Sequence, residues 1–214
     1  MRFYFIRHGE SEGNAVMRCY GQYDGALTPL GEKQAEAAAK ALSGVHFDKI
    51  YSSDLQRAYK TALAQAKGRG IEVIKNPGLR EIFVGDWENQ TWDYIETNYK
   101  QAYYDWIHHP EIMKAPGGEA MTEVYERITD TVEKIAAENA PDSTICVVSH
   151  CCVLKNLMCY FMKRPLSRLN EVWITNASYT VADYDGKDWN VVSVSNDKYL
   201  EPLGVIAVPP WSGK

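Results

Sequence analysis

The chain has 214 residues, of which 45% are apolar and 24% charged, and its formal net charge at pH 7 is −5. This composition excludes a disordered or fibrous protein, and the acidic balance argues against a general nucleic-acid binder, which normally carries a basic excess. No apolar run approaches the roughly 18 residues that span a bilayer, so we expect no membrane association. The five cysteines lack framework spacing and the first residues are charged too early for a secretory signal, which together predict a cytoplasmic protein with reduced thiols.

Strand-like and helix-like segments alternate through the first half of the chain. Residues 2–6 are a short apolar run that predicts a strand, and a stretch rich in Gly and polar residues follows up to Gly25. Thr28 and Pro29 are typical of an N-cap and a first helical residue, and the alanine-rich helix that they begin reaches Leu42. The next predicted elements are a strand over 47–52, a helix capped by Asp54 that ends near Gly68 or Gly70, and a strand over 71–74.

The second half continues this alternation after one stretch of different character. Large aromatic residues are dense between Trp87 and Trp106, which indicates a helical insertion with its own small core. Apolar residues at helical spacing predict a helix over about 122–138. The continuous apolar run over 144–149 predicts a strand buried on both faces. The later predictions are a helix over 151–161, strands over 171–175 and 178–184, and a turn at Asp185-Gly186 before a strand over 189–194.

The alternation of strands and helices predicts the architecture. We expect a three-layer α/β/α sandwich with a mostly parallel sheet and ligands at the carboxyl ends of its strands. One domain is expected over 1–214, with a small helical cap insertion at about 86–118. Val208–Trp211 presents a tryptophan near the end of the chain, which hints at a docked tail or a partner contact. Nothing in the sequence specifies an oligomeric state.

Two histidines directly follow predicted strands, His8 after the first and His150 after the long apolar one. In a parallel sheet both emerge at the same edge, and each precedes backbone N–H groups that can bind an anion. Arg7 adjoins His8, and Arg57 lies on the helix that follows the second strand. Taken singly, each residue is explained as a packed histidine or a solvated arginine. Together, two guanidinium groups, two imidazoles and helix amides indicate a phosphate site.

Short motifs around these residues occur in a definite order along the chain. They are Arg7-His8-Gly9-Glu10-Ser11 with Asn14, Leu27-Thr28-Pro29-Leu30-Gly31, Ser52-Ser53-Asp54-Leu55-Gln56-Arg57-Ala58, Leu79-Arg80-Glu81-Ile82, Pro116-Gly117-Gly118-Glu119 and Val147-Val148-Ser149-His150. In this order they resemble the histidine phosphatase superfamily, which includes the cofactor-dependent phosphoglycerate mutases. One departure is Cys151-Cys152 after His150, where the family usually has glycine first. A cysteine fits there only where the backbone does not need a positive φ.

The resemblance implies a metal-independent phosphomonoester hydrolase that acts through a phosphohistidine intermediate and needs no cofactor. By that resemblance His8 is the nucleophile, Arg7, Arg57 and His150 hold the phosphoryl oxygens, and Glu81 is the proton donor. The residues expected to contact the substrate are Arg7, Ser11, Asn14, Gln22, Arg57 and Cys151. The expected partner is a small-molecule phosphomonoester. Four other carboxylates lie close enough in sequence to keep the identity of the acid open: Glu10, Glu12, Asp86 and Glu88.

Other functions remain open at this stage. A phosphoglycerate mutase-type phosphoryl transferase is the first, although the segment over 86–92 resembles the phosphatase branch and the insertion has few cations. A non-catalytic module that binds a phospho-ligand is the second, and the presence of His8, Arg57, Glu81 and His150 argues against it. The third is a serine hydrolase, because Gly9-Glu10-Ser11-Glu12-Gly13 matches a nucleophile elbow, but only one strand precedes it.

Two features of the sequence have a functional and a structural interpretation. The aromatic residues of the insertion either pack on the non-phosphate part of a substrate or hold the cap to the sheet. Cys151 is either a redox-sensitive thiol at a helix N-terminus or a small residue at a packed turn.

Overall fold

The computed structural model describes residues 1–204, so Val208–Trp211 lies outside the described residues. Its central sheet has six strands in the order β4-β3-β6-β1-β7-β8. β4, β3, β6 and β1 run parallel to one another, whereas β7 is antiparallel to β1 and β8 is antiparallel to β7. The predicted mostly parallel sheet is therefore confirmed. The strands are β1 (Arg2–Arg7), β3 (Lys49–Ser52), β4 (Val73–Lys75), β6 (Thr144–Ser149), β7 (Tyr179–Tyr184) and β8 (Trp189–Asn196).

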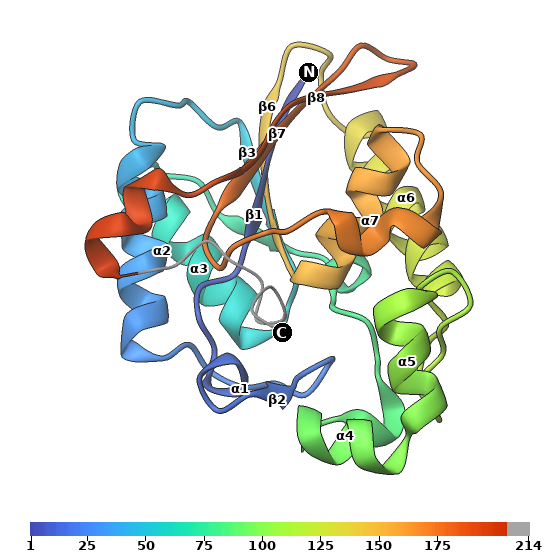
Figure 1. Cartoon of the computed structure of the whole chain (residues 1–214). Coiled ribbons are helices and arrows are strands. Elements are labelled where there is room, and N and C mark those ends of the chain that lie inside the picture. Colours follow the sequence, from blue (N-terminus) through green and yellow to red (C-terminus); the bar gives the residue numbers. More distant parts are fainter. Residues whose placement is uncertain (205–214) are drawn as a thin grey trace.

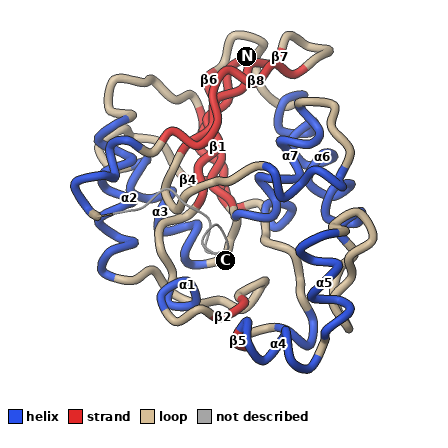
Figure 2. The backbone as a smooth tube through the Cα atoms, viewed as in Figure 1, coloured by secondary structure: helices blue, strands red, loops and turns tan. Residues whose placement is uncertain are grey.

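Helices cover both faces of this sheet (Figures 1 and 2). α2 (Pro29–Ala41) and α3 (Gln56–Ala66) pack on one face, and α6 (Met121–Ala137) and α7 (Cys151–Phe161) pack on the other. Side chains alternate along a strand, so neighbouring residues of β6 enter two different apolar clusters, one beneath each helical layer. This arrangement confirms the three-layer sandwich.

Smaller elements lie beyond the carboxyl ends of the parallel strands (Figure 1). The two-stranded pairing of β2 with β5 joins the segment that follows β1 to the insertion that carries α4 and α5. None of these short elements except the helical insertion is predicted by the sequence patterns. They are α1 (Glu12–Ala15), β2 (Arg18–Cys19), β5 (Gln90–Thr91), α4 (Trp92–Asn98) and α5 (Lys100–His108). The described chain also forms short 3-10 helices, η1 (Pro77–Leu79), η2 (Gly85–Trp87), η3 (Leu166–Glu171) and η4 (Lys198–Leu203), the last of which packs beside α2.

The aromatic residues of the insertion pack on one another and on the main apolar core. Trp87 is fully buried, and its ring centroid lies 6.2 Å from that of Tyr99 and 6.0 Å from that of Trp106. The ring of Trp92 lies 5.8 Å from that of Trp106. Trp87 also belongs to the large apolar cluster on the α6 and α7 side of the sheet, and Trp92, Tyr99 and Trp106 pack against that cluster. The prediction of a separate small core is therefore wrong: these rings join the insertion to the main core and have a structural role.

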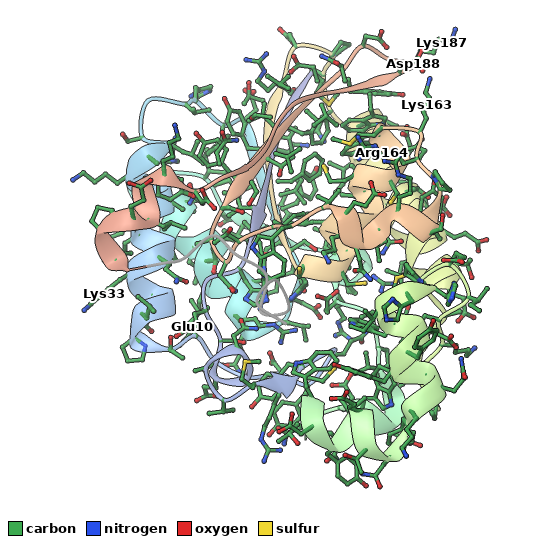
Figure 3. The ribbon with its side chains drawn as sticks, in the orientation of Figure 1. Glu10, Lys33, Lys163, Arg164, Lys187 and Asp188 are labelled. Atoms are coloured by element: carbon green, nitrogen blue, oxygen red, sulfur yellow. The ribbon has the colours of Figure 1, made fainter. Side chains whose placement is uncertain are left out.

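The turn at Asp185-Gly186 joins β7 to β8, as the sequence predicts. Figure 3 shows Asp188 beside Lys163 at one end of the molecule, and these side chains form an ion pair of 2.8 Å. Glu10 lies toward the opposite end (Figure 3). The β7–β8 turn is therefore remote from the edge of the sheet that carries the candidate site. Within residues 1–204, none of the helices combines the length and the apolar character that crossing a bilayer requires.

Two local predictions are wrong. The segment over 171–175 is not a strand: η3 ends at Glu171, and residues 172–175 have no regular structure. The edge of β1 on this side is already paired with β7, so the segment has no free strand to join. Asp54 does not cap α3, whose N-cap is Leu55 without a side-chain hydrogen bond. The Asp54 carboxylate instead accepts two hydrogen bonds from Arg80, of 2.7 and 2.6 Å.

Candidate active site

His8 and His150 meet at the carboxyl edge of the sheet. β1 and β6 are adjacent and parallel, and the His8 N–H donates to the Ser149 carbonyl at 3.0 Å, which continues the ladder past the strand ends. Both imidazoles are buried, and their ring centroids lie 5.1 Å apart. The sequence prediction that the two histidines emerge together is therefore confirmed.

The environment of His8 favours a neutral ring with a free nitrogen lone pair. Its Nδ1 lies 2.6 Å from the carbonyl oxygen of Gly9. A carbonyl can only accept, so Nδ1 carries the hydrogen and Nε2 carries the lone pair. Burial, together with the nearby cations Arg57 and Arg7, lowers the pKa of His8 well below its usual value. His8 is therefore neutral at physiological pH, and its Nε2 is available as a nucleophile.

Two buried arginines, Arg7 and Arg57, lie close enough to His8 for their positive charges to lower its pKa. Arg7 donates from Nη1 to the carbonyl of Ile174 at 2.6 Å, and Arg57 donates to the carbonyls of Tyr23 and Gly21 at 2.9 and 2.6 Å. Among residues 1–204, neither guanidinium forms an ion pair, and the Arg7 Nε–H is buried without an acceptor. Because a buried cation that is not paired directly with a carboxylate is costly, this arrangement favours an anionic ligand.

Glu81 is buried against the amino end of α7. Its Oε1 accepts from the N–H groups of Ile82 and Val153 at 3.0 and 3.3 Å, and its Oε2 accepts from that of Cys152 at 3.1 Å. Burial raises the pKa of Glu81 above its usual value, and this effect exceeds the opposing effect of the N–H donors and the arginines. A carboxyl group with a raised pKa suits proton donation.

This contact corrects the predicted role of the helix amides. From the sequence we expect the N–H groups that follow His150 to bind an anion, but two of them, those of Cys152 and Val153, already donate to Glu81. After His8, the Gly9 N–H likewise donates to the Thr61 hydroxyl at 3.1 Å. The cations and imidazoles, rather than these amides, are thus the groups left to hold a phosphate.

The other carboxylates near Glu81 in sequence are engaged or exposed. The carboxylate of Glu88 accepts from the N–H groups of Gln22, Tyr23 and Val84 at 2.7–3.2 Å, which marks it as a structural anchor. The remaining three lie at the protein surface or accept from neighbouring loops: Glu10, Glu12 and Asp86. Their placement leaves Glu81 as the buried acid beside the histidines.

Ser11 and Asn14 are held by each other. Ser11 is buried, caps α1, accepts from the Asn14 N–H at 3.3 Å and donates to Asn14 Oδ1 at 3.1 Å. Because Ser11 is buried and hydrogen-bonded to Asn14, it does not fit the exposed nucleophile that a serine hydrolase requires. Asn14 Oδ1 also accepts from Asn176 Nδ2, which in turn donates to the His8 carbonyl at 3.1 Å. Asn176 therefore links the segment after β1 to the segment before β7.

Gln22 and Cys151 lie beside the acid and the second histidine. Gln22 Nε2 donates to the carbonyl of Glu81 at 3.2 Å. Cys151 is partly exposed, follows His150 directly and is absent from the non-glycine residues of positive φ in the described chain. The departure from glycine therefore causes no backbone strain at this position.

Arg127 on α6 is a site residue that the sequence patterns do not reveal. It donates to the carbonyls of Gly78, Arg80 and Glu81 at 2.8–3.4 Å and forms a bidentate ion pair with Glu119. One side chain thus organises the loop that carries Glu81. The only sequence signal is its place on the polar side of an amphipathic helix, which most arginines share. No group of three His, Cys, Asp or Glu side chains in the described part of the chain could hold a metal ion.

Comparisons with known proteins agree with this geometry. The profile of the histidine phosphatase superfamily (branch 1) matches residues 3–197. Phosphoserine phosphatase 1 of Hydrogenobacter thermophilus is 34% identical over 181 residues, which are 85% of each chain. A probable phosphoglycerate mutase, GpmB of Yersinia pestis, is 30% identical over 189 residues, 88% of this chain and 87% of that one.

Solved structures share the fold. Bacillus stearothermophilus YhfR superposes with a TM-score of 0.90 at 31% identity, covering 93% of this chain and 98% of that one. A mycobacterial glucosyl-3-phosphoglycerate phosphatase, Rv2419c, superposes with a TM-score of 0.84 at 30% identity, covering 91% and 98%. The chain belongs to the histidine phosphatase superfamily (branch 1), and the protein is a phosphatase of that superfamily.

Proposed function

We propose that this phosphatase hydrolyses a small-molecule phosphomonoester through a phosphohistidine intermediate on His8. The observation that carries the proposal is the neutral, buried His8, whose Nδ1 is hydrogen-bonded to a backbone carbonyl and whose Nε2 keeps a lone pair. The buried guanidinium groups of Arg7 and Arg57 supply positive charge for a phosphate dianion. Because these groups offset the charge of the phosphate, the proposed reaction needs no metal ion or cofactor.

The first step transfers the phosphoryl group to His8. Nε2 attacks phosphorus in line, the N–P bond forms, and the ester P–O bond breaks with its electron pair on the leaving oxygen. Arg7, Arg57 and His150 hold the phosphoryl oxygens and offset their charge in the transition state. Glu81, whose pKa is raised by burial, gives its proton to the leaving oxygen, so that an alcohol departs.

The second step releases inorganic phosphate. A water molecule attacks the phosphohistidine, the ionised Glu81 takes its proton, and the N–P bond breaks with its electron pair on Nε2 of His8. Both residues thereby return to their starting protonation states. The same two groups serve both steps in reversed roles.

The substrate is proposed to be a small phosphate ester whose organic part lies toward the insertion over 86–118, the proposed cap. The names of the similar proteins support this class, because they describe phosphatases of phosphoserine and of glucosyl-3-phosphoglycerate. Tyr94 and Tyr104 are the most exposed aromatic side chains of the insertion, and they are proposed to contact the organic part of the ligand.

The test is hydrolysis of a panel of serine, glycerate, sugar, nucleoside and aryl phosphates in excess EDTA. The wild type is expected to turn over at least one ester without metal, and His8→Ala to lose that activity. His46→Ala is the matched control, because the His46 side chain is 87% exposed and precedes the amino end of β3, opposite the edge that carries the site. Retained activity in a folded His8→Ala variant contradicts the proposed nucleophile.

A mutase is the second candidate, because a probable phosphoglycerate mutase is among the relatives. A coupled assay that converts 3-phosphoglycerate to 2-phosphoglycerate distinguishes the two activities. Release of inorganic phosphate without isomerisation supports the phosphatase, and isomerisation faster than release supports the mutase. Binding of phosphate by a folded wild type that turns over no ester supports a non-catalytic binding module.

A further inference from the structure

The two ring nitrogens of His150 have different surroundings. Nε2 lies 2.9 Å from the hydroxyl oxygen of Ser53, whereas Nδ1 is buried without a hydrogen-bond partner in the described part of the chain. The His150 ring lies beside that of His8. The unpartnered nitrogen is therefore the one left to meet a ligand in the site.

The fold places Ser53 beside His150 through the sheet. The Ser53 N–H donates to the carbonyl of Val148 at 3.0 Å, which extends the parallel pairing of β3 and β6 one residue past the end of β3. Ser53 is fully buried, and its Oγ also accepts from the Leu55 N–H at 3.3 Å. The hydroxyl thus has one acceptor position filled and one hydrogen to donate.

Two proton arrangements fit the contact between Ser53 and His150. In the first, the Ser53 hydroxyl donates to Nε2, and Nδ1 carries the ring hydrogen. In the second, Nε2–H donates to Ser53, whose own hydrogen then needs another acceptor. Ser53 Oγ makes no further hydrogen bond within residues 1–204, so the second arrangement leaves the Ser53 hydroxyl hydrogen buried without an acceptor. The first arrangement places the unsatisfied hydrogen on Nδ1, where a phosphoryl oxygen in the site can accept it.

The charge of the ring agrees with the first arrangement. Burial and the cations Arg57 and Arg7, together with His8, lower the pKa of His150 well below its usual value, so the ring is neutral and carries a single hydrogen. A neutral imidazole with its hydrogen on Nε2 would turn a lone pair toward the phosphoryl oxygens and repel them. With the hydrogen on Nδ1, the same ring donates to a phosphoryl oxygen.

We propose that Ser53 is a positioning residue that donates to Nε2 of His150 and thereby fixes the Nδ1–H tautomer as a neutral donor to the phosphoryl group. The inference rests on the proposed function for its kinetic consequence, but not for the tautomer itself. No proton leaves His150 during the reaction in this scheme. The role of Ser53 is thus to decide which nitrogen faces the ligand.

The direct test is ¹⁵N NMR of histidine-labelled protein, free and with inorganic phosphate, with the His150 signals assigned through His150→Gln. The wild type is expected to have a protonated Nδ1 and an unprotonated Nε2 on His150. Ser53→Ala is expected to lose this pattern and Ser53→Thr, which keeps the hydroxyl, to restore it. Ser52→Ala is the matched control, since the Ser52 hydroxyl is equally buried but donates to a backbone carbonyl at 2.8 Å.

The kinetic arm uses the best ester from the panel. Ser53→Ala is expected to lower kcat/KM and to weaken the binding of inorganic phosphate roughly 10- to 100-fold, the range for one hydrogen bond to a charged group. Ser52→Ala is expected to change thermal stability but neither quantity. If Ser53→Ala does not fold, Ser53→Cys replaces it, because a thiol is a weak donor.

Several results overturn the proposal. They are a wild-type His150 protonated on Nε2, a Ser53→Ala variant that keeps the Nδ1–H tautomer, and a changed tautomer with unaltered kcat/KM and phosphate affinity. Failure of the proposed function is distinct from these results. In that case the wild type hydrolyses no ester, and the tautomer and phosphate affinity of Ser53→Ala still decide the role of Ser53.

Discussion

Replacement of Glu81 by glutamine separates proton donation from positioning. The glutamine carbonyl oxygen can take the place of Oε1 and accept from Ile82 and Val153, but its NH₂ group then faces the Cys152 N–H, which Oε2 accepts at 3.1 Å. The backbone N–H of Cys152 then lacks an acceptor, which lowers the free energy of unfolding by about 1–3 kcal/mol. That loss is tolerable for a domain of this size, and urea unfolding measures it.

The expected kinetic effect depends on the leaving group. General acid catalysis contributes roughly 100- to 10,000-fold, so kcat/KM of Glu81→Gln for an alkyl phosphate is expected to fall by that factor. p-Nitrophenyl phosphate has a leaving group that needs no proton, and its kcat/KM is expected to change less than about 10-fold. Because Glu81 also activates the water, the variant is expected to accumulate phosphohistidine and to show a burst of nitrophenol.

The pH dependence has a definite sign. Burial raises the pKa of Glu81, and only its protonated form gives a proton to an alkoxide. The kcat/KM of the wild type for the alkyl phosphate is therefore expected to fall as pH rises through this raised pKa, which lies above the ordinary value of about 4.3. Glu81→Gln lacks this alkaline limb.

Equal losses of kcat/KM for the alkyl and the aryl ester would refute this reasoning, because a residue that only positions the site does not sense the leaving group. Unchanged kcat/KM for the alkyl ester would exclude Glu81 as the acid altogether. Arg127→Lys is a useful comparison. It disturbs the loop that carries Glu81 without removing the carboxyl group, so its losses are expected to be similar for both esters.

Three further outcomes are expected. Arg57→Lys, which cannot reach two carbonyls and a phosphate together, should weaken inorganic phosphate binding by calorimetry roughly 10- to 100-fold; unchanged affinity would remove Arg57 from the phosphate site. Gly85→Ala should destabilise more than Gly68→Ala in urea by about 1–3 kcal/mol, because both have positive φ but only the former places a Cβ against a facing backbone; equal losses would contradict the clash. Burial lowers the pKa of both His8 and His150, so the unfolded chain binds more protons and stability should fall below about pH 6.5. Each histidine contributes up to about 1.4 kcal/mol per pH unit to this loss in the free energy of unfolding. His8→Gln should therefore make the free energy of unfolding depend less steeply on pH between about pH 6.5 and 5.5.

The sequence alone predicts the layers of the fold and the meeting of the two histidines. Both follow from local patterns: apolar runs of strand length, Thr28 as an N-cap that the structure confirms, and a histidine placed directly after each of two buried strands. Parallel strands bring their carboxyl ends to one edge, so strand assignment is enough to predict that His8 and His150 are neighbours. The order of motifs around them identifies the superfamily for the same reason, because each motif is local.

Tertiary structure decides what those residues can do. The carboxyl group of Glu81 lies on the amino end of α7, so two of the amides predicted to bind phosphate, those of Cys152 and Val153, are already engaged. Ser53 reaches His150 only because β3 lies beside β6. The segment over 171–175 is strand-like in composition yet cannot pair, because β7 occupies the free edge of β1. Distant segments compete for the same hydrogen-bond donors, acceptors and strand edges. A local sequence pattern contains no information about which of these contacts forms.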